Sequence, residues 1–89
     1  MIHCEEWRTI IDIEEHDDHT EAVARLQTRD ATHLEGRGRA RRNPGDRDVP
    51  EIGAELAAAR ALGELAHRLL DAAIRDIEQA TGHTAHVAG

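Results

Sequence analysis

The chain of 89 residues is long enough for one small domain, and it carries a net charge of −7. Trp7 is its only aromatic residue, so any core must be built from Ala, Leu, Ile and Val. Ser, Lys and Tyr are missing, which excludes serine nucleophiles and lysine Schiff bases. Cys4 is the single cysteine, so no internal disulfide can form. A core with so few large apolar residues predicts that the fold needs additional stabilisation, first from self-association and second from a metal.

Location and charge narrow the class of protein further. No stretch approaches the roughly 20 apolar residues of a membrane span, and the acidic start MIHCEEWRT lacks the apolar segment of a signal peptide. We therefore expect a cytoplasmic protein with no membrane partner. Residues 1–20 carry a net charge of −6, residues 21–47 carry +3 and residues 48–89 carry −4. The middle third of the chain is therefore basic, and both flanks are acidic.

Two segments near the N-terminus alternate with a period of two, which is typical of strands. From Glu6 to Glu14, one face carries Trp7, Thr9, Ile11 and Ile13. From Thr20 to Arg29, one face carries Ala22, Ala24, Leu26 and Thr28. The short polar connection EEHDDHT predicts that the two strands form a hairpin, and RDATH predicts the next turn.

The stretch GRGRARRNP continues this pattern. From Leu34, the small residues Gly36, Gly38 and Ala40 alternate with charged ones. Glycines weaken a strand unless another backbone comes close, so we predict a third antiparallel strand with its small face against a helix. The turn signal NPGD ends it, with Gly45 suited to positive φ. A dinucleotide-binding loop is disfavoured because the third glycine of that fingerprint is missing.

The second half of the chain predicts one long helix. Asp48 can cap its start, with Glu51 three residues later and Pro50 in the first turn, and Gly82 can end it. Apolar residues recur every three or four positions, forming a stripe: Ile52, Leu56, Ala59, Leu62, Ala66, Leu69, Ala73 and Ile77. Thirty residues span roughly 45 Å, which is longer than the strands. Either the helix breaks near Gly63, or its far half packs on something else, with a second subunit as the obvious candidate.

The expected architecture is α+β: a three-stranded antiparallel meander covered on one face by a long C-terminal helix, in the order β-β-β-α. We expect one domain over residues 1–89, with an ordered core from about residue 5 to residue 82 and short terminal tails. HTAHVAG is the C-terminal tail.

The order of motifs resembles a family of small actinobacterial proteins of unknown function, whose best-known members belong to the mycobacterial dormancy response. The resemblance runs from about Trp7 to Thr81, and its most specific run has the form NPxDxxVPxIGxELxxARAL. The residues that carry it are Ile13 to His16, Thr20, Ala22, Ala24, Leu26, Gly36, Gly38, Ala40, Arg41, Asn43, Pro44, Asp46, Val49, Pro50, Ile52, Gly53, Glu55, Leu56, Ala59 to Leu62, Leu65 and Asp76 to Glu78.

The resemblance implies a fold similar to double-stranded-RNA-binding domains without their first helix, and a homodimer. It also implies a role in slowing translation during stress or dormancy, by likeness to ribosome hibernation factors. The resemblance implies Val or Leu where this chain has Arg37, Arg39 and Arg42. If those apolar residues belong to a dimer interface, the dimer is altered here. If the face is open, it is more basic than in the family.

The arginines are the first candidate site. The face opposite the helix would gather Arg8, Arg25, Arg29, Arg37, Arg39 and Arg41. Six guanidinium groups form a phosphate-binding surface suited to the ribosome or structured RNA, and without Phe or Tyr it would contact the backbone rather than stack on bases. The alternative is a solvated edge protected by charge, with the arginines paired to Asp12, Glu21 and Glu35.

Histidines are the second candidate site. His16 and His19 flank two aspartates in HDDH, and His83 and His86 repeat the spacing in the tail. Imidazole can bind zinc or another transition metal, but the absence of a Cys-x-x-Cys pair favours surface histidines that titrate near neutral pH. His16 and His19 are therefore only weak metal candidates, and no cofactor is expected.

No group of residues indicates catalysis. Glu14, Glu15, Asp17 and Asp18 cluster at a hairpin tip, where carboxylates are solvated. We expect no enzymatic activity and no small-molecule substrate. Two functions stay open: a stress-associated dimer that binds the ribosome or RNA through its arginine face, or a protein-interaction dimer with a solvated arginine face.

Overall fold

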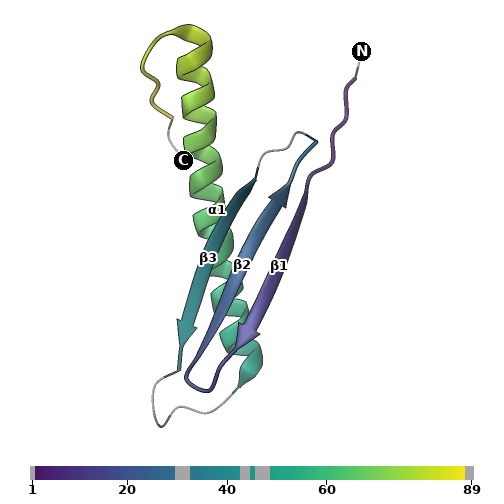
Figure 1. Ribbon diagram of the computed structural model, residues 1–89, viewed down its shortest axis with the longest axis vertical. Coiled ribbons are helices and arrows are strands. Elements are labelled where there is room, and N and C mark those ends of the chain that lie inside the picture. The colour runs from purple at the N-terminus through teal and green to yellow at the C-terminus, as the bar shows by residue number, and fades with distance from the viewer. Residues whose placement is uncertain (1, 30–32, 43–44, 46–48, 88–89) are drawn as a thin grey trace.

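The structure, a computed structural model, describes residues 2–29, 33–42, 45 and 49–87. The described residues form β1 (Arg8–Glu15), β2 (His19–Gln27), β3 (Leu34–Arg41) and α1 (Pro50–Thr81). The strands make an antiparallel sheet in the order β1-β2-β3, and α1 crosses one face of it (Figure 1). The predicted α+β meander with a long C-terminal helix is therefore confirmed.

The strand register brings small residues onto the face under α1. Ala24 in β2 lies between Ile11 of β1 and Gly36 of β3, and Ala22 lies between Ile13 and Gly38. The predicted division of faces is correct. The predicted strand ends are not, because β1 begins two residues later than Glu6 and β2 ends two residues before Arg29.

The core is built mainly from alanine. Its buried apolar residues are Ala22, Ala24, Leu26, Ala40, Ala57, Ala61 and Leu65, with Ile11, Leu34 and Leu69 partly buried beside them. No large side chain among the described residues is fully buried. Burial of apolar area is the main favourable term in folding, so this single chain draws a small stabilisation from its own core.

Two glycines set the spacing between α1 and the sheet. A Cβ atom on Gly38 would overlap the carbonyl oxygen of Ala57, and one on Gly36 would overlap the carbonyl oxygen of Ala61. The added Cβ on Gly36 would also lie 2.9 Å from the Cα of Leu65. The backbones therefore meet directly, as the sequence GRGRA predicts, and only a small helix face fits over β3.

The helix α1 is continuous over 32 residues and passes through Gly63 without a break. At 1.5 Å per residue it is about 48 Å long, whereas an eight-residue strand spans about 26 Å. Its C-terminal half accordingly runs past the end of the sheet (Figure 1). In the described part of the chain, no helix combines the length and the apolarity needed to cross a membrane.

Of the two predicted caps of α1, the C-terminal one is present and the N-terminal one is not seen in the described residues. Val49 is the N-cap residue and makes no side-chain cap hydrogen bond, while Asp48 lies outside the described residues. At the other end Gly82 has a φ of 72° and donates its N–H to the carbonyl of Glu78 at 2.8 Å, as predicted. Gly45 has the expected positive φ, at 92°. The remaining residues of that turn, and residues 30–32 of the predicted RDATH turn, lie outside the described ranges.

Candidate functional site

Most of the predicted arginines do share the helix-free face of the sheet. The strand register places five there: Arg8, Arg25, Arg37, Arg39 and Arg41. Arg29, the sixth predicted arginine, does not lie on this face, because β2 ends at Gln27 and Arg29 lies beyond the sheet. Its Nη1 atom lies 3.5 Å from His3 Nε2, so Arg29 faces the N-terminal segment instead.

Carboxylates neutralise the central part of this face. Arg25 forms ion pairs with Asp12 across one strand pair and with Glu35 across the other, the latter at 3.7 Å. Arg37 pairs with Glu35 at 3.1 Å, and Arg8 pairs with Glu6 at 3.2 Å. This pairing matches the interpretation of a charged, solvated face for Arg8, Arg25 and Arg37.

The C-terminal end of β3 is different. Arg39 and Arg41 are exposed, lie opposite Glu21 and His19, and form no ion pair with any residue that the structure describes. Arg42 follows them and donates a 2.9 Å hydrogen bond to the carbonyl oxygen of Asp17, which ties the strand to the hairpin. The basic surface is thus reduced to one corner of the sheet.

Side chains of α1 cover the free edge of β3. The carboxylate of Glu64 accepts a 3.3 Å hydrogen bond from the backbone N–H of Arg37, and Arg60 donates one of 2.7 Å to the carbonyl of Arg39. These contacts occupy edge groups that could otherwise pair with another strand. Sequence reasoning missed them, because only the rotation of α1 over the sheet reveals which helix residues reach β3.

The apolar stripe of α1 points away from the sheet. Its large members Ile52, Leu56, Leu62 and Ile77 are 41–55% exposed, and only Leu69 joins the core in part. The alanines of the stripe, Ala59, Ala66 and Ala73, are exposed as well. We call this surface, with its eight members from Ile52 to Ile77, the outer stripe. The residues that pack on the sheet are Ala57, Ala61 and Leu65 instead.

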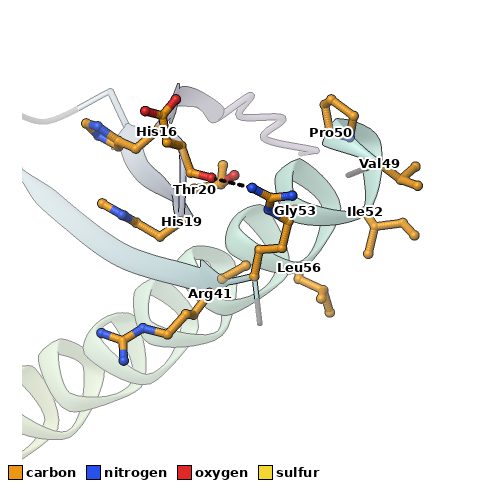
Figure 2. A pocket seen from close by; sticks show the side chains of 12 residues that line it. His16, His19, Thr20, Arg41, Val49, Pro50, Ile52, Gly53 and Leu56 are labelled. Atoms are coloured by element: carbon orange, nitrogen blue, oxygen red, sulfur yellow. Dashed lines mark hydrogen bonds between the residues drawn. The ribbon is translucent and has the colours of Figure 1, made fainter. Parts of the chain in front are cut away.

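A hollow lies where the first turn of α1 meets the hairpin between β1 and β2 (Figure 2). Gly53 and Thr20 meet on its inner wall, and a Cβ on Gly53 would lie 2.8 Å from the hydroxyl of Thr20. Ile52 and Leu56 supply an apolar side, and Arg41 a basic one. The rings of His16 and His19 extend together from its rim.

The structure brings the two candidate histidines into contact. The ring centroids of His16 and His19 are 4.3 Å apart and nearly parallel, at 12°. His19 Nδ1 donates a 2.6 Å hydrogen bond to Asp18, and this bond holds the pKa of the Asp18 carboxyl below its usual value. Glu21 joins them, with its carboxylate 3.3 Å from His19 Nε2. Glu21 was not among the metal candidates from the sequence.

The family model, the related sequences and a solved structure all relate this chain to the same family. The model of the Rv2632c-like family matches residues 5–86. The uncharacterized protein Mb1767 of Mycobacterium bovis is 48% identical over 81 residues, which cover 91% of this chain and 85% of that protein. The uncharacterized protein Rv2632c of Mycobacterium tuberculosis is 48% identical over 69 residues, covering 78% and 73% respectively. The crystal structure of Rv2632c superposes with a TM-score of 0.83 at 40% identity, covering 92% of this chain and 96% of that one.

Proposed function

The chain belongs to the Rv2632c-like family, and we propose that it is a non-enzymatic interaction module that works as a homodimer. In this dimer the outer stripe of α1 packs against a second copy of the chain. The observation that carries the proposal is the orientation of α1, which packs Ala57, Ala61 and Leu65 on the sheet and leaves most of the large residues of the outer stripe exposed.

An isolated helix on a sheet should do the reverse. Burial of a leucine or isoleucine side chain contributes roughly 1.5–3 kcal/mol, whereas alanine contributes less because it has less apolar area. The close approach at Gly36 and Gly38 brings the backbone of Ala57, Ala61 and Leu65 against β3. The large residues of the outer stripe stay 41–55% exposed in this fold, and a partner that covers them would supply the missing burial.

The length of the outer stripe sets the size of the interface. From Ile52 to Ile77 it is about 38 Å long, and at a width of about 10 Å it covers roughly 400 Å². A standard interface buries about 800 Å² on each partner. Contact between the two helices alone is about half of that, so the interface must also include other apolar surface. Ile13, on the helix side of β1, and Trp7, just before β1, are 45% and 48% exposed and are suited to this role.

The test measures whether a charge placed in the outer stripe converts the dimer into single chains. Leu62→Glu places a charge in the middle of the stripe while keeping a good helix former. Gln79→Glu is the matched control. It adds the same charge five helical turns after Ala61, on the side of α1 that faces the sheet and not in the outer stripe. By sedimentation equilibrium, the wild type and Gln79→Glu should have twice the 9.8 kDa mass of the chain, and Leu62→Glu should have the single mass. A monomeric wild type would overturn the proposal.

Binding to the ribosome or to structured RNA is a second candidate, supported by one observation. Arg39 and Arg41 stay exposed at the end of β3 without an ion pair inside the described ranges, and Arg42 lies beside them. Such free guanidinium groups suit phosphate contacts. The mixed charge on the rest of the face and the net charge of −7 oppose extended nucleic-acid binding. A role in dormancy stays an expectation from the resemblance.

The RNA candidate is tested by salt-dependent co-sedimentation with ribosomal subunits. Each phosphate contact contributes a slope of roughly −0.7 to −0.9 in log affinity against log salt. Arg39→Ala/Arg41→Ala should therefore lower the slope by nearly two units. Arg68→Ala/Arg75→Ala removes the same charge from α1 and should leave it unchanged. Absence of co-sedimentation at low salt, or equal effects of the two double variants, would exclude binding through this corner.

A further inference from the structure

We infer that His16, His19 and Glu21 form a binding site for a divalent transition metal of the zinc type, at the hairpin between β1 and β2. The donor atoms of these three side chains all lie within 4.8 Å of one another. Neither the dimer nor the RNA candidate uses this site, so the inference is independent of both.

The hairpin itself brings the three donors together. Glu15 pairs with Thr20, so His16 and His19 are the next residues across the turn, and the backbone N–H of His16 donates to the carbonyl of His19 at 2.8 Å. Alternation along β2 puts Glu21 on the same face as His19. A closed two-residue turn therefore holds two imidazoles and one carboxylate on one side of the sheet.

One distance within the cluster already matches tetrahedral coordination, and the remaining donor atoms lie within 4.8 Å. With metal–ligand bonds of about 2.0–2.1 Å, the edge of a tetrahedron is about 3.3 Å. His19 Nε2 lies 3.3 Å from Glu21 Oε1, and His16 Nε2 lies 3.2 Å from Glu14 Oε1. Glu14 faces Glu21 across the two strands. Glu14 does not belong to the group of donors that all lie within 4.8 Å of one another, so water is the expected fourth ligand.

Asp18 orients the central ligand. Its carboxylate accepts the hydrogen bond from His19 Nδ1 at 2.6 Å, which leaves Nε2, 3.3 Å from the Glu21 carboxylate, as the nitrogen that can bind a metal. A carboxylate behind a histidine is the usual outer partner in zinc sites, because it fixes the tautomer and the ring orientation. This second contact distinguishes the cluster from histidines that merely share a surface.

The surrounding charges also favour a cation. Glu14 and Glu21 form a like-charge pair across β1 and β2, an arrangement that costs stability without a cation nearby. Arg39 and Arg41 lie opposite Glu21 and His19 on β3 and oppose the metal. The three carboxylates of Glu14, Asp18 and Glu21 outnumber these two arginines. Imidazole with carboxylate selects zinc-like ions, whereas Mg²⁺ prefers oxygen ligands alone.

The test is isothermal titration of the chelator-treated full chain with ZnCl₂ and, separately, MgCl₂. We expect one Zn²⁺ per chain and no heat with Mg²⁺. His19→Ala and Glu21→Gln should each weaken zinc binding at least tenfold. The matched control is His83→Ala/His86→Ala, which removes two histidines of the same spacing from the tail and should leave the affinity unchanged. Circular dichroism checks that each variant is folded.

A second readout reports the ligands directly. In ¹H–¹⁵N spectra of the imidazoles, Zn²⁺ should shift the ring nitrogens of His16 and His19 and leave those of His83 and His86 in place. Zinc binding that survives His19→Ala would contradict the site. So would loss of binding in the tail variant, or a stoichiometry of one ion per two chains.

Discussion

The carboxylate of Glu64, in the middle of α1, accepts a hydrogen bond of 3.3 Å from the backbone N–H of Arg37 on the free edge of β3. One turn earlier, Arg60 donates to the carbonyl of Arg39 at 2.7 Å. The helix thus covers the sheet and also occupies hydrogen-bonding groups on its edge. Exposed strand edges promote association between chains, so these two contacts protect the edge of β3 from pairing with another strand.

Removing both contacts should expose this edge. Arg60→Ala/Glu64→Ala is expected to aggregate faster than the wild type on incubation near the melting temperature, measured by light scattering. His67→Ala/Asp71→Ala breaks an exposed ion pair within α1 and serves as the control. Equal aggregation of the two double variants would show that the edge contacts have no protective role.

Gly38→Ala should destabilise the fold severely. The added Cβ would overlap the backbone carbonyl of Ala57, and backbone on both sides cannot yield as a flexible side chain would. We expect a loss of about 3 kcal/mol or more in the free energy of unfolding, measured by urea denaturation.

The matched control is a glycine in open space. A Cβ on Gly63 would have no described atom within 4 Å. Gly63→Ala should raise the free energy of unfolding by about 0.5–1 kcal/mol, because alanine favours the helix. A loss of less than 1 kcal/mol for Gly38→Ala would refute the close packing of α1 on β3.

The same glycines explain how much of the fold could be predicted. Alternation along three short segments and the small residues of GRGRA indicated a meander under a helix, and the structure agrees. The prediction for Arg29 was wrong because the period-two pattern of the sequence continues to Arg29, whereas β2 ends at Gln27. The alternation of residues in one segment does not show where its hydrogen bonds to the neighbouring strand end.

The sites were less predictable than the fold. Hydrophobicity marked Leu56 and Leu62 as the packing face of α1, yet the glycines beneath the helix select Ala57 and Ala61. Likewise, HDDH showed two histidines, but Glu21 joins them only through the strand register. Both features depend on contacts between elements, which no single segment contains.

The ion pairs of Arg25 should contribute little to stability. Arg25 contacts both Asp12 and Glu35, but all three side chains are substantially exposed to solvent. Exposed pairs contribute about 0.2–1 kcal/mol each and are screened by salt. Arg25→Ala should lower the free energy of unfolding by at most about 1 kcal/mol, and less in 1 M NaCl. A larger loss that persists at high salt would indicate a structural role that these contacts do not explain.

The melting temperature should depend on protein concentration. A dimer that unfolds to two chains gains stability by mass action. For two chains of 89 residues the unfolding enthalpy predicts an increase of about 4 °C for each tenfold rise in concentration. Leu62→Glu should melt at one temperature throughout the range. Scanning calorimetry of both proteins over two decades of concentration makes the comparison, and a constant melting temperature for the wild type would contradict dimerisation.

Dimerisation through the outer stripe is tested most directly by a search for contacts between two copies of α1. A mixture of ¹³C-labelled and unlabelled chains, examined by isotope-filtered NMR, reports only contacts between different molecules. A dimer through the outer stripe predicts intermolecular NOEs from the methyl groups of Ile52, Leu56, Leu62 and Ile77, and none from Ala57 or Ala61, which pack on the sheet. Intermolecular NOEs confined to other surfaces, or none at all at millimolar concentration, would contradict it.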